Sequence, residues 1–178
     1  MKPTVLCYYF PNYHPDDPRN ARVHGPGWSE WELVKAARPR FEGHDQPRVP
    51  AWGYTDESDP AVMARKIALA ADHGIDAFLF DWYWYEDGPF LERALEQGYL
   101  SAVNRDRVRF CCMWANHDWQ LIHPIRRDEA PGLAGGAGPR RLYPGRLTPT
   151  AFAAMIDRLV GRYFIDPSYL TVEGRPYF

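Results

Sequence analysis

The sequence predicts an α/β fold with a parallel sheet, closed as a TIM-type (β/α)8 barrel. Buried-type strands alternate with amphipathic helices along the chain, which is the order that βαβ units produce. No glycine-rich phosphate turn such as GxGxxG follows any of the strands, and this disfavours a doubly wound nucleotide-binding sheet. Aromatic and polar residues instead follow each of the first three strands, as they do at the catalytic face of a barrel.

Strands are expected at residues 4–10, 75–81 and 108–114, with the start of a fourth near Gly174. The first three segments are rich in β-branched and aromatic residues and nearly uninterrupted in their apolarity. This pattern is typical of parallel strands that are covered on both faces. The fourth segment is cut off at Phe178, the last residue of the chain.

Three helices are expected between these strands. Asp59 is a cap residue followed by Pro60 at the first helical position, and this helix ends at Gly74. The second helix is expected to start after Asp87, and the third is capped by Thr148. The apolar stripe of the third helix follows the helical spacing and consists of Phe152, Met155, Ile156, Leu159 and Tyr163.

The length of the chain bounds this fold. A complete barrel needs about 250 residues and small ones about 200, whereas the chain has 178. We therefore expect residues 1–178 to form a single barrel domain that covers about the first four β/α units and is truncated at the C-terminus. Two long irregular segments, residues 11–57 and 128–146, interrupt the alternation, and connections of such length are usually functional.

Charge and composition exclude several classes of protein. Lys and Arg number 21 against 23 Asp and Glu, so the net charge is -2 and we expect no nucleic-acid partner. No apolar run reaches the roughly 18 residues of a membrane span, and the N-terminus lacks a signal-peptide plan, so we expect a cytoplasmic protein without a membrane span. Cys7, Cys111 and Cys112 lie in apolar strand-like runs, which argues against a disulfide framework.

Aromatic residues make up 15% of the chain, and many of them gather in three clusters at residues 10–14, 81–85 and 114–119. Sugars present apolar C–H faces that lie on aromatic rings and hydroxyl groups that pair with Asp, Asn and His. The clusters supply both kinds of side chain and predict an oligosaccharide or polysaccharide substrate. The alternative is that the rings fill the core of the barrel.

Asp81 and Asp118 are the candidate catalytic carboxylates. A carboxylate beside Trp82 and Trp84 has the environment of a general acid or of a tight hydroxyl acceptor, although it could instead tie down a loop amide. His117 and Asp118 fit a structural hydrogen-bond pair as well as a substrate contact. The histidines lack HExxH spacing and no GxSxG motif occurs, so we expect neither a metal nor another cofactor.

Five segments carry a resemblance to a known family: YYFPNYHPDDPRN, GPGWSEWELVKAARPRFEGHDQPRVP, DHGIDAFLFDWYWYEDGPFLERAL, MWANHDW and YLTVEGRPYF. In this order, over nearly the whole chain, they resemble the WbsX-like family with a glycoside hydrolase family 99-like domain. The resemblance implies a (β/α)8 barrel that acts on glycans by hydrolysis or transfer. Members of the family are associated with bacterial polysaccharide and O-antigen (lipopolysaccharide) synthesis, and relatives are endo-acting α-mannosidases.

The clusters and the resemblance together give one set of candidate substrate-binding residues. The set is Asn12, His14, Trp28, Glu30, Trp31, His44, Gln46, Asp81, Trp82, Tyr83, Trp84, Trp114, Asn116, His117, Asp118 and Trp119.

Two departures from the family pattern bear on catalysis. Many members have Glu at the position of His117, and the hydrolase relatives place their paired catalytic glutamates in an Asn-Glu-Trp-x-Glu-type segment that this chain lacks. We therefore expect a carbohydrate-active domain without the catalytic pair. The alternative is a non-catalytic glycan-binding or scaffold protein of envelope glycan assembly.

Overall fold

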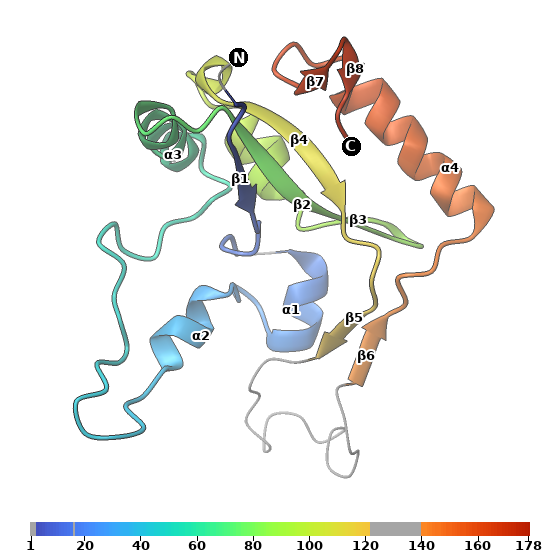
Figure 1. Cartoon of the computed structure of the whole chain (residues 1–178). Coiled ribbons are helices and arrows are strands. Elements are labelled where there is room, and N and C mark those ends of the chain that lie inside the picture. The colour runs from blue at the N-terminus through green and yellow to red at the C-terminus, as the bar shows by residue number, and fades with distance from the viewer. Residues whose placement is uncertain (1–2, 16, 122–139) are drawn as a thin grey trace.

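The computed structural model describes residues 3–15, 17–121 and 140–178. Its centre is a parallel sheet of three strands, β1 (Leu6–Tyr9), β2 (Ala77–Tyr85) and β4 (Arg109–Trp114), with β2 in the middle. These strands lie side by side in the order in which they occur in the chain, as consecutive strands of a (β/α)8 barrel do. The predicted parallel α/β fold is confirmed, and the described strands form an open sheet rather than a closed barrel (Figure 1).

Helices α3 (Pro60–Asp72) and α4 (Pro149–Arg158) begin at the predicted caps. The Asp59 side chain accepts a hydrogen bond from the Ala61 amide at 2.8 Å, and the Thr148 hydroxyl accepts one from Ala151 at 3.3 Å. The end of α4 continues as the π-helix η4 (Leu159–Tyr163). Both helices turn an apolar side into the core: Met63 and Ile67 of α3 and Met155 of α4 are fully buried, whereas Phe152 of the predicted stripe remains 45% exposed.

The second predicted helix is wrong over its first turn. Residues 86–87 form a turn, and β3 (Gly88–Phe90) runs back antiparallel to the end of β2, with Tyr83 opposite Phe90. Gly88 adopts a φ of 105°, a conformation that side chains rarely allow, and so it favours the turn over a helix start. The helical part is η1 (Ala94–Tyr99), a π-helix, followed by the 3-10 turn η2 (Arg105–Arg107).

Smaller elements lie at the two ends of the sheet. Helices α1 (Pro18–His24) and α2 (Trp31–Ala36) and the hairpin of β5 (Trp119–Leu121) and β6 (Arg140–Tyr143) lie beyond the carboxyl ends of the strands (Figure 1). At the far end, β7 (Thr171–Val172) pairs antiparallel with β8 (Arg175–Pro176). The fourth strand expected near Gly174 therefore starts as β8 within a hairpin, and the parallel bridge to β4 comes from Tyr169 instead.

The two faces of β2 have different neighbours. Successive side chains of a strand point to opposite faces. Phe78, Phe80 and Trp82 belong to the main core, in which Tyr99 of η1 lies 5.8 Å from Phe80 and Tyr163 of η4 lies 5.9 Å from Trp82, ring centre to ring centre. The opposite face carries Asp81 and is more open.

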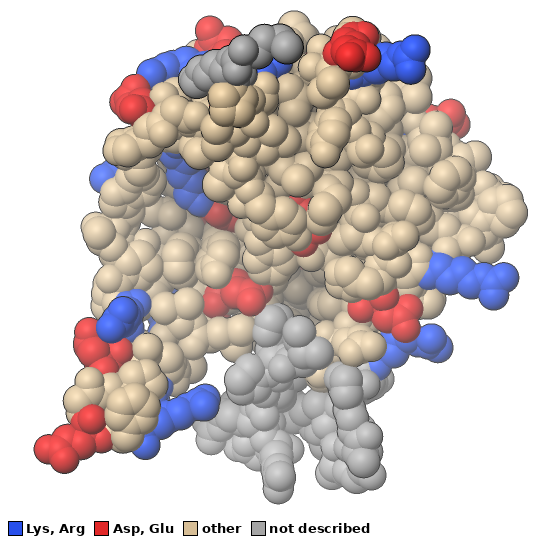
Figure 2. Space-filling view, viewed as in Figure 1, with Lys and Arg blue, Asp and Glu red and all other residues tan. Residues whose placement is uncertain are grey.

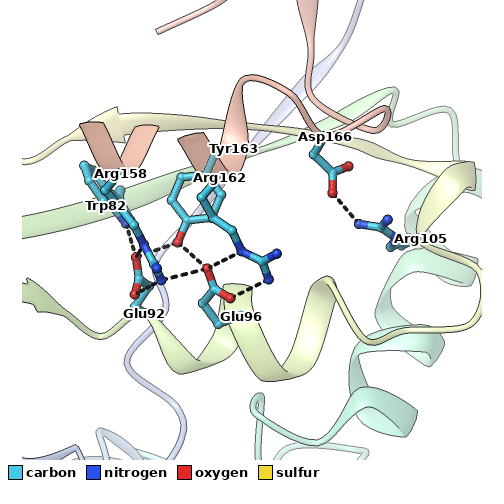
Figure 3. Close-up of polar contacts among 8 residues, drawn as sticks. All are labelled: Trp82, Glu92, Glu96, Arg105, Arg158, Arg162, Tyr163 and Asp166. Atoms are coloured by element: carbon cyan, nitrogen blue, oxygen red, sulfur yellow. Dashed lines mark hydrogen bonds and ion pairs between the residues drawn. The ribbon is translucent and has the colours of Figure 1, made fainter. Parts of the chain in front are cut away.

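A network of ion pairs holds η1 against the end of α4 (Figure 3). Arg158 contacts both Glu92 and Glu96, and Arg162 contacts Glu96 at 2.8 Å. The Tyr163 hydroxyl donates to both carboxylates, and the Trp82 indole N–H donates to Glu92 at 3.2 Å. The network thereby fixes the helices that cover β2 and β4 and holds Trp82 on the helix side. None of the described helices has the length and apolarity to cross a membrane.

Candidate functional site

Asp81 lies on the open face of β2, near the carboxyl end of its parallel pairing with β4. Its side chain is only 4% exposed, and Oδ2 accepts a hydrogen bond from the Tyr83 hydroxyl at 2.5 Å. Tyr8 of β1 lies on the same face, opposite Leu79. Desolvation raises the pKa of both tyrosines, and the neighbouring Asp81 carboxylate raises it further, so both hydroxyls stay protonated. The other oxygen, Oδ1, is buried without a partner among the described residues.

A cavity of about 340 Å³ lies at the carboxyl ends of the strands; Tyr83, which donates to Asp81, lines it, whereas Asp81 itself does not. We call it the central cavity; it is lined by Phe10, Asn12, Asn20, Glu30, Tyr83, Phe90, Leu91, His117, Asp118, Trp119 and Gln120. Its volume falls in the range of about 300–1,000 Å³ that is usual for small-molecule sites, and it combines aromatic rings with convergent polar groups. Figure 2, in the same view as Figure 1, shows acidic side chains recessed within a largely uncharged surface.

A chain of amide and carboxylate groups orders one wall of the central cavity. Asn20 donates to the Asn12 side-chain oxygen at 2.9 Å, and Asn12 donates to Glu30 Oε2 at 2.5 Å. The Glu30 amide also donates to the Asn12 carbonyl at 3.0 Å. Glu30, which lies 18 positions farther along an irregular segment, is thus held against the end of β1.

Asp118 and His117 form another wall, and they do not bond through their side chains. Asp118 Oδ1 accepts from the Gly145 amide at 2.8 Å, and Oδ2 lies 3.6 Å from Arg141 Nη1. His117 Nδ1 lies 3.0 Å from the Asp118 carbonyl oxygen, and its exposed ring meets Tyr83 edge-on at 5.8 Å. Asp118 therefore ties down a loop amide and lines the cavity at the same time.

Trp119 supplies the largest aromatic surface of the central cavity. Its ring is half-buried and packs on Phe90 at 4.5 Å and on Tyr143 at 5.7 Å between ring centres. Of the sixteen candidate residues, the structure brings six to this cavity, namely Asn12, Glu30, Tyr83, His117, Asp118 and Trp119.

Trp82 and Trp84 lie on the other face of β2. They are 2% and 8% exposed and belong to the core, so the structure places these rings away from the face that carries Asp81. His14 is fully buried, with Nδ1 3.4 Å from the Pro15 carbonyl oxygen and Nε2 without a described partner. For these two tryptophans, the alternative that the aromatic rings fill the core is the correct one.

The remaining candidates lie outside the lining of the central cavity. Trp28 stacks on His24 at 4.0 Å, and His44 stacks on Phe41 at 4.5 Å. The Trp31 indole donates to the Thr55 carbonyl at 2.7 Å and lines a separate cavity of about 310 Å³. Trp114 and Asn116 line a third cavity together with Asp118, and Gln46 is half-buried in the loop that follows α2.

Three residues at or near the site were not predicted from the sequence. Tyr8 could have been inferred, because its register partner Leu79 lies two residues before Asp81 on the same face. Asn20 carries no local signal and is placed by the α1 cap, in which the Asp17 side chain accepts from its amide at 3.4 Å. Arg19, also buried, donates to the Pro89 carbonyl at 2.6 Å and holds α1 against the β2–β3 hairpin.

Among residues 3–15, 17–121 and 140–178, no group of three or more His, Cys, Asp or Glu side chains could hold a metal ion. His14, His44 and His117 lie within these residues, whereas His123 lies outside them. All three cysteines are free. The described chemistry of the site therefore consists of carboxylates, amides, hydroxyls and aromatic rings.

Comparison with solved structures supports the fold. Two structures of the GH99 endo-alpha-mannosidase from Bacteroides thetaiotaomicron, one of them in complex with bis-tris-propane, match with TM-scores of 0.51 and 0.52 at 14% and 15% identity. The matches cover 97% and 99% of this chain but only 43% and 41% of theirs. At this level of identity the likeness shows a shared fold.

Sequence comparison establishes the family. Two curated relatives from Xanthomonas campestris pv. campestris, strains B100 and ATCC 33913, both described as the uncharacterized protein WxcX, are 35% identical over 174 residues. The match covers 97% of this chain and 23% of each relative, so the chain spans about a quarter of their length. The family model described as Glycosyltransferase WbsX matches residues 5–178. The chain therefore belongs to the WbsX glycosyltransferase family.

Proposed function

We propose that the chain is the sugar-binding part of a glycan-acting protein and that the central cavity holds one sugar unit of an oligosaccharide or polysaccharide. The observation that carries this proposal is the convergence of Asn12, Glu30, Tyr83, Asp118 and Trp119 on a single cavity from separate segments of the chain. Aromatic rings accept the apolar face of a sugar, and amide and carboxylate groups accept its hydroxyls.

Asp81 would act through Tyr83 in this proposal. Its Oδ2 accepts a hydrogen bond from the Tyr83 hydroxyl, and Tyr83 lines the central cavity. With its proton held by Asp81, the Tyr83 hydroxyl oxygen can accept a hydrogen bond from a sugar hydroxyl. The role proposed for Asp81 is therefore to position Tyr83 rather than to react with the sugar.

The whole protein would cleave or transfer a glycosyl group during bacterial polysaccharide or O-antigen synthesis. This finer proposal rests on the WbsX family and on the fold shared with endo-alpha-mannosidases. Such chemistry normally needs two carboxylates, one as acid and one as nucleophile or base. The sequence given has no Asn-Glu-Trp-x-Glu-type segment, so we assign sugar binding to this chain and the chemistry to a catalytic pair outside it.

A non-catalytic glycan-binding or scaffold function is the second candidate. The observation that favours it is that both carboxylates of the central cavity already accept structural hydrogen bonds, Glu30 from Asn12 and Asp118 from the Gly145 amide. A turnover assay distinguishes the two functions. A scaffold binds glycans but neither cleaves nor transfers them, whether the chain or the full-length protein is assayed.

The test is a titration of the purified chain with α-linked mannotriose, followed by tryptophan emission and by calorimetry. We expect binding that changes little between low and moderate salt, because few charges take part. The Trp119→Ala variant should lose most of the affinity, whereas Trp52→Ala, which removes a half-buried indole from a different cavity, should keep it. No binding by the parent chain, or equal affinities of the parent and Trp119→Ala, would exclude the central cavity as the sugar site.

A further inference from the structure

A second and larger cavity lies on the helix side of β4, between the carboxyl end of that strand and the start of α4. We call it the outer cavity. It measures about 800 Å³ and is lined by Trp114, Asn116, Asp118, Gly145, Arg146, Leu147, Thr148, Pro149 and Phe152. The segment that leaves β4 and the segment that leads into α4 run side by side here (Figure 1).

Two aromatic rings form the apolar side of the outer cavity. The Phe152 ring lies 6.0 Å from the Trp114 ring, centre to centre, at an interplanar angle of 54°. Phe152 belongs to the apolar stripe of α4, yet it remains 45% exposed while Met155 and Leu159 on the same helix are fully buried. Its ring is therefore only partly used by the core and offers a surface to a ligand.

The rim of the outer cavity is polar and carries charges of both signs. Asn116 and Arg146 are exposed beside the rings, and Asp118 lies across from them as the one carboxylate of the lining. Such a mixture of donors and acceptors suits the hydroxyl groups of a neutral ligand. A ligand with a large net charge would meet repulsion from either Asp118 or Arg146.

Asp118 is a wall of both cavities, and the structure fixes this shared wall tightly. The Gly145 amide holds Asp118 Oδ1 at 2.8 Å. A Cβ atom at position 145 would lie 2.5 Å from the His117 carbonyl carbon, a distance that side chains do not tolerate. Only glycine allows the two segments to approach this closely, so the positions of the two cavities relative to each other are set by backbone contact.

From this geometry we propose that the outer cavity binds a second, neutral sugar unit of the glycan whose neighbouring unit occupies the central cavity. The rings of Trp114 and Phe152 take its apolar face, and Asn116, Asp118 and Arg146 take its hydroxyls. This inference rests on the proposed function, because the shared wall at Asp118 bears on glycan binding only if a glycan fills the central cavity.

The test compares a short and a long probe, methyl α-mannoside and α-linked mannopentaose, by calorimetry on the purified chain. The Phe152→Ala variant should bind mannopentaose roughly two- to tenfold more weakly than the parent, the range expected for one lost aromatic contact. Its affinity for methyl α-mannoside should be unchanged, because a single sugar unit is held by the central cavity alone. Phe152→Trp, which keeps a ring, should retain the affinity for mannopentaose.

Phe41→Ala provides the matched control, since Phe41 is another exposed phenylalanine and contributes to none of the three cavities. Thermal unfolding of each variant confirms that it is folded. An equal loss of affinity for both probes, or no loss for either, would overturn the outer cavity as a sugar site while leaving the central cavity intact. If the parent binds neither probe, the proposed function itself fails and this inference fails with it.

Discussion

At the scale of single residues, the site depends on which hydrogen-bond partners its polar atoms have. Asp81 is nearly inaccessible, and the Tyr83 hydroxyl donates to its Oδ2 while Tyr8 lies on the same face. The two tyrosines differ in surroundings, because Tyr83 is buried whereas Tyr8 is 54% exposed. Loss of the hydroxyl should therefore have different consequences at the two positions.

We expect Tyr83→Phe to lower the free energy of unfolding by about 1–3 kcal/mol, because it removes a donor from a buried carboxylate. Tyr8→Phe should cost less, since water can replace the lost hydroxyl at a partly exposed position. Chemical denaturation of both variants at neutral pH measures the difference. A larger effect at Tyr8 than at Tyr83 would contradict the burial argument.

Gly145 is a second residue whose role follows from a single close contact. The Gly145→Ala variant should be destabilised by about 1–3 kcal/mol, the usual cost of overpacking, because its Cβ would meet the backbone at His117. Gly161→Ala is the control: nothing lies within 4 Å of a Cβ at that position in η4, so helix propensity should stabilise the protein by roughly 0.5–1 kcal/mol. A lower melting temperature for Gly145→Ala and a higher one for Gly161→Ala would support both arguments, and equal shifts would refute them.

At the scale of elements, the helices that cover the sheet are held to each other by ionised groups. Glu96 joins η1 to α4 and η4 (Figure 3). Burial alone would raise the pKa of Glu96, but hydrogen bonds from Arg162 and Tyr163 and the charges of Arg158 and Arg162 lower it overall. A carboxyl group whose pKa is lowered by folding stabilises the protein above its unfolded pKa, and that contribution disappears as the pH falls through the folded value.

The free energy of unfolding, measured between pH 7 and pH 3, should therefore fall as the pH drops below 4.5, the ordinary pKa of a glutamate. Protonation of Glu96 contributes to this loss. Glu96→Gln should remove about 1–3 kcal/mol at pH 7 and flatten the acid slope. Glu32→Gln, which breaks the exposed pair with Lys35, should change little at either pH. An acid slope in Glu96→Gln as steep as in the parent would show that the network is not responsible.

Local patterns in the sequence predicted most of the helices and strands. The direction in which the site side chains point depends on contacts between residues that are far apart in the chain. Asp59 and Thr148 mark the starts of their helices, because each side chain caps a backbone amide two or three residues farther along. The run Asp81–Tyr85 is aromatic on both faces of β2, so its alternation could not reveal which rings face the helices and which face the cavity. Asn12, Asn20 and Glu30 meet only after an irregular segment folds back, and no periodicity encodes that contact.

At the scale of the whole molecule, the residues proposed to bind sugar lie at one end of an open parallel sheet. The strands of β1, β2 and β4 direct their carboxyl ends toward the central cavity, as (β/α)8 barrels do with their active sites. The chain covers 43% and 41% of the two endo-alpha-mannosidase structures that share its fold and leaves more than half of each unmatched. Binding and turnover can therefore reside in different parts of a full-length protein.

We expect the 178-residue chain to bind glycans without glycosidase or glycosyltransferase activity. Cleavage normally needs two carboxyl groups about 5–5.5 Å apart for retention, or about 6.5–9.5 Å for inversion, and one of them must donate a proton. Asp81 accepts from Tyr83, Glu30 from Asn12 and Asp118 from Gly145, so each of these carboxyl groups is placed as an acceptor. The assay is turnover of α-linked manno-oligosaccharides and aryl glycosides by the parent, Asp81→Asn and Asp118→Asn. Turnover by the parent that both substitutions abolish would place the catalytic pair within this chain.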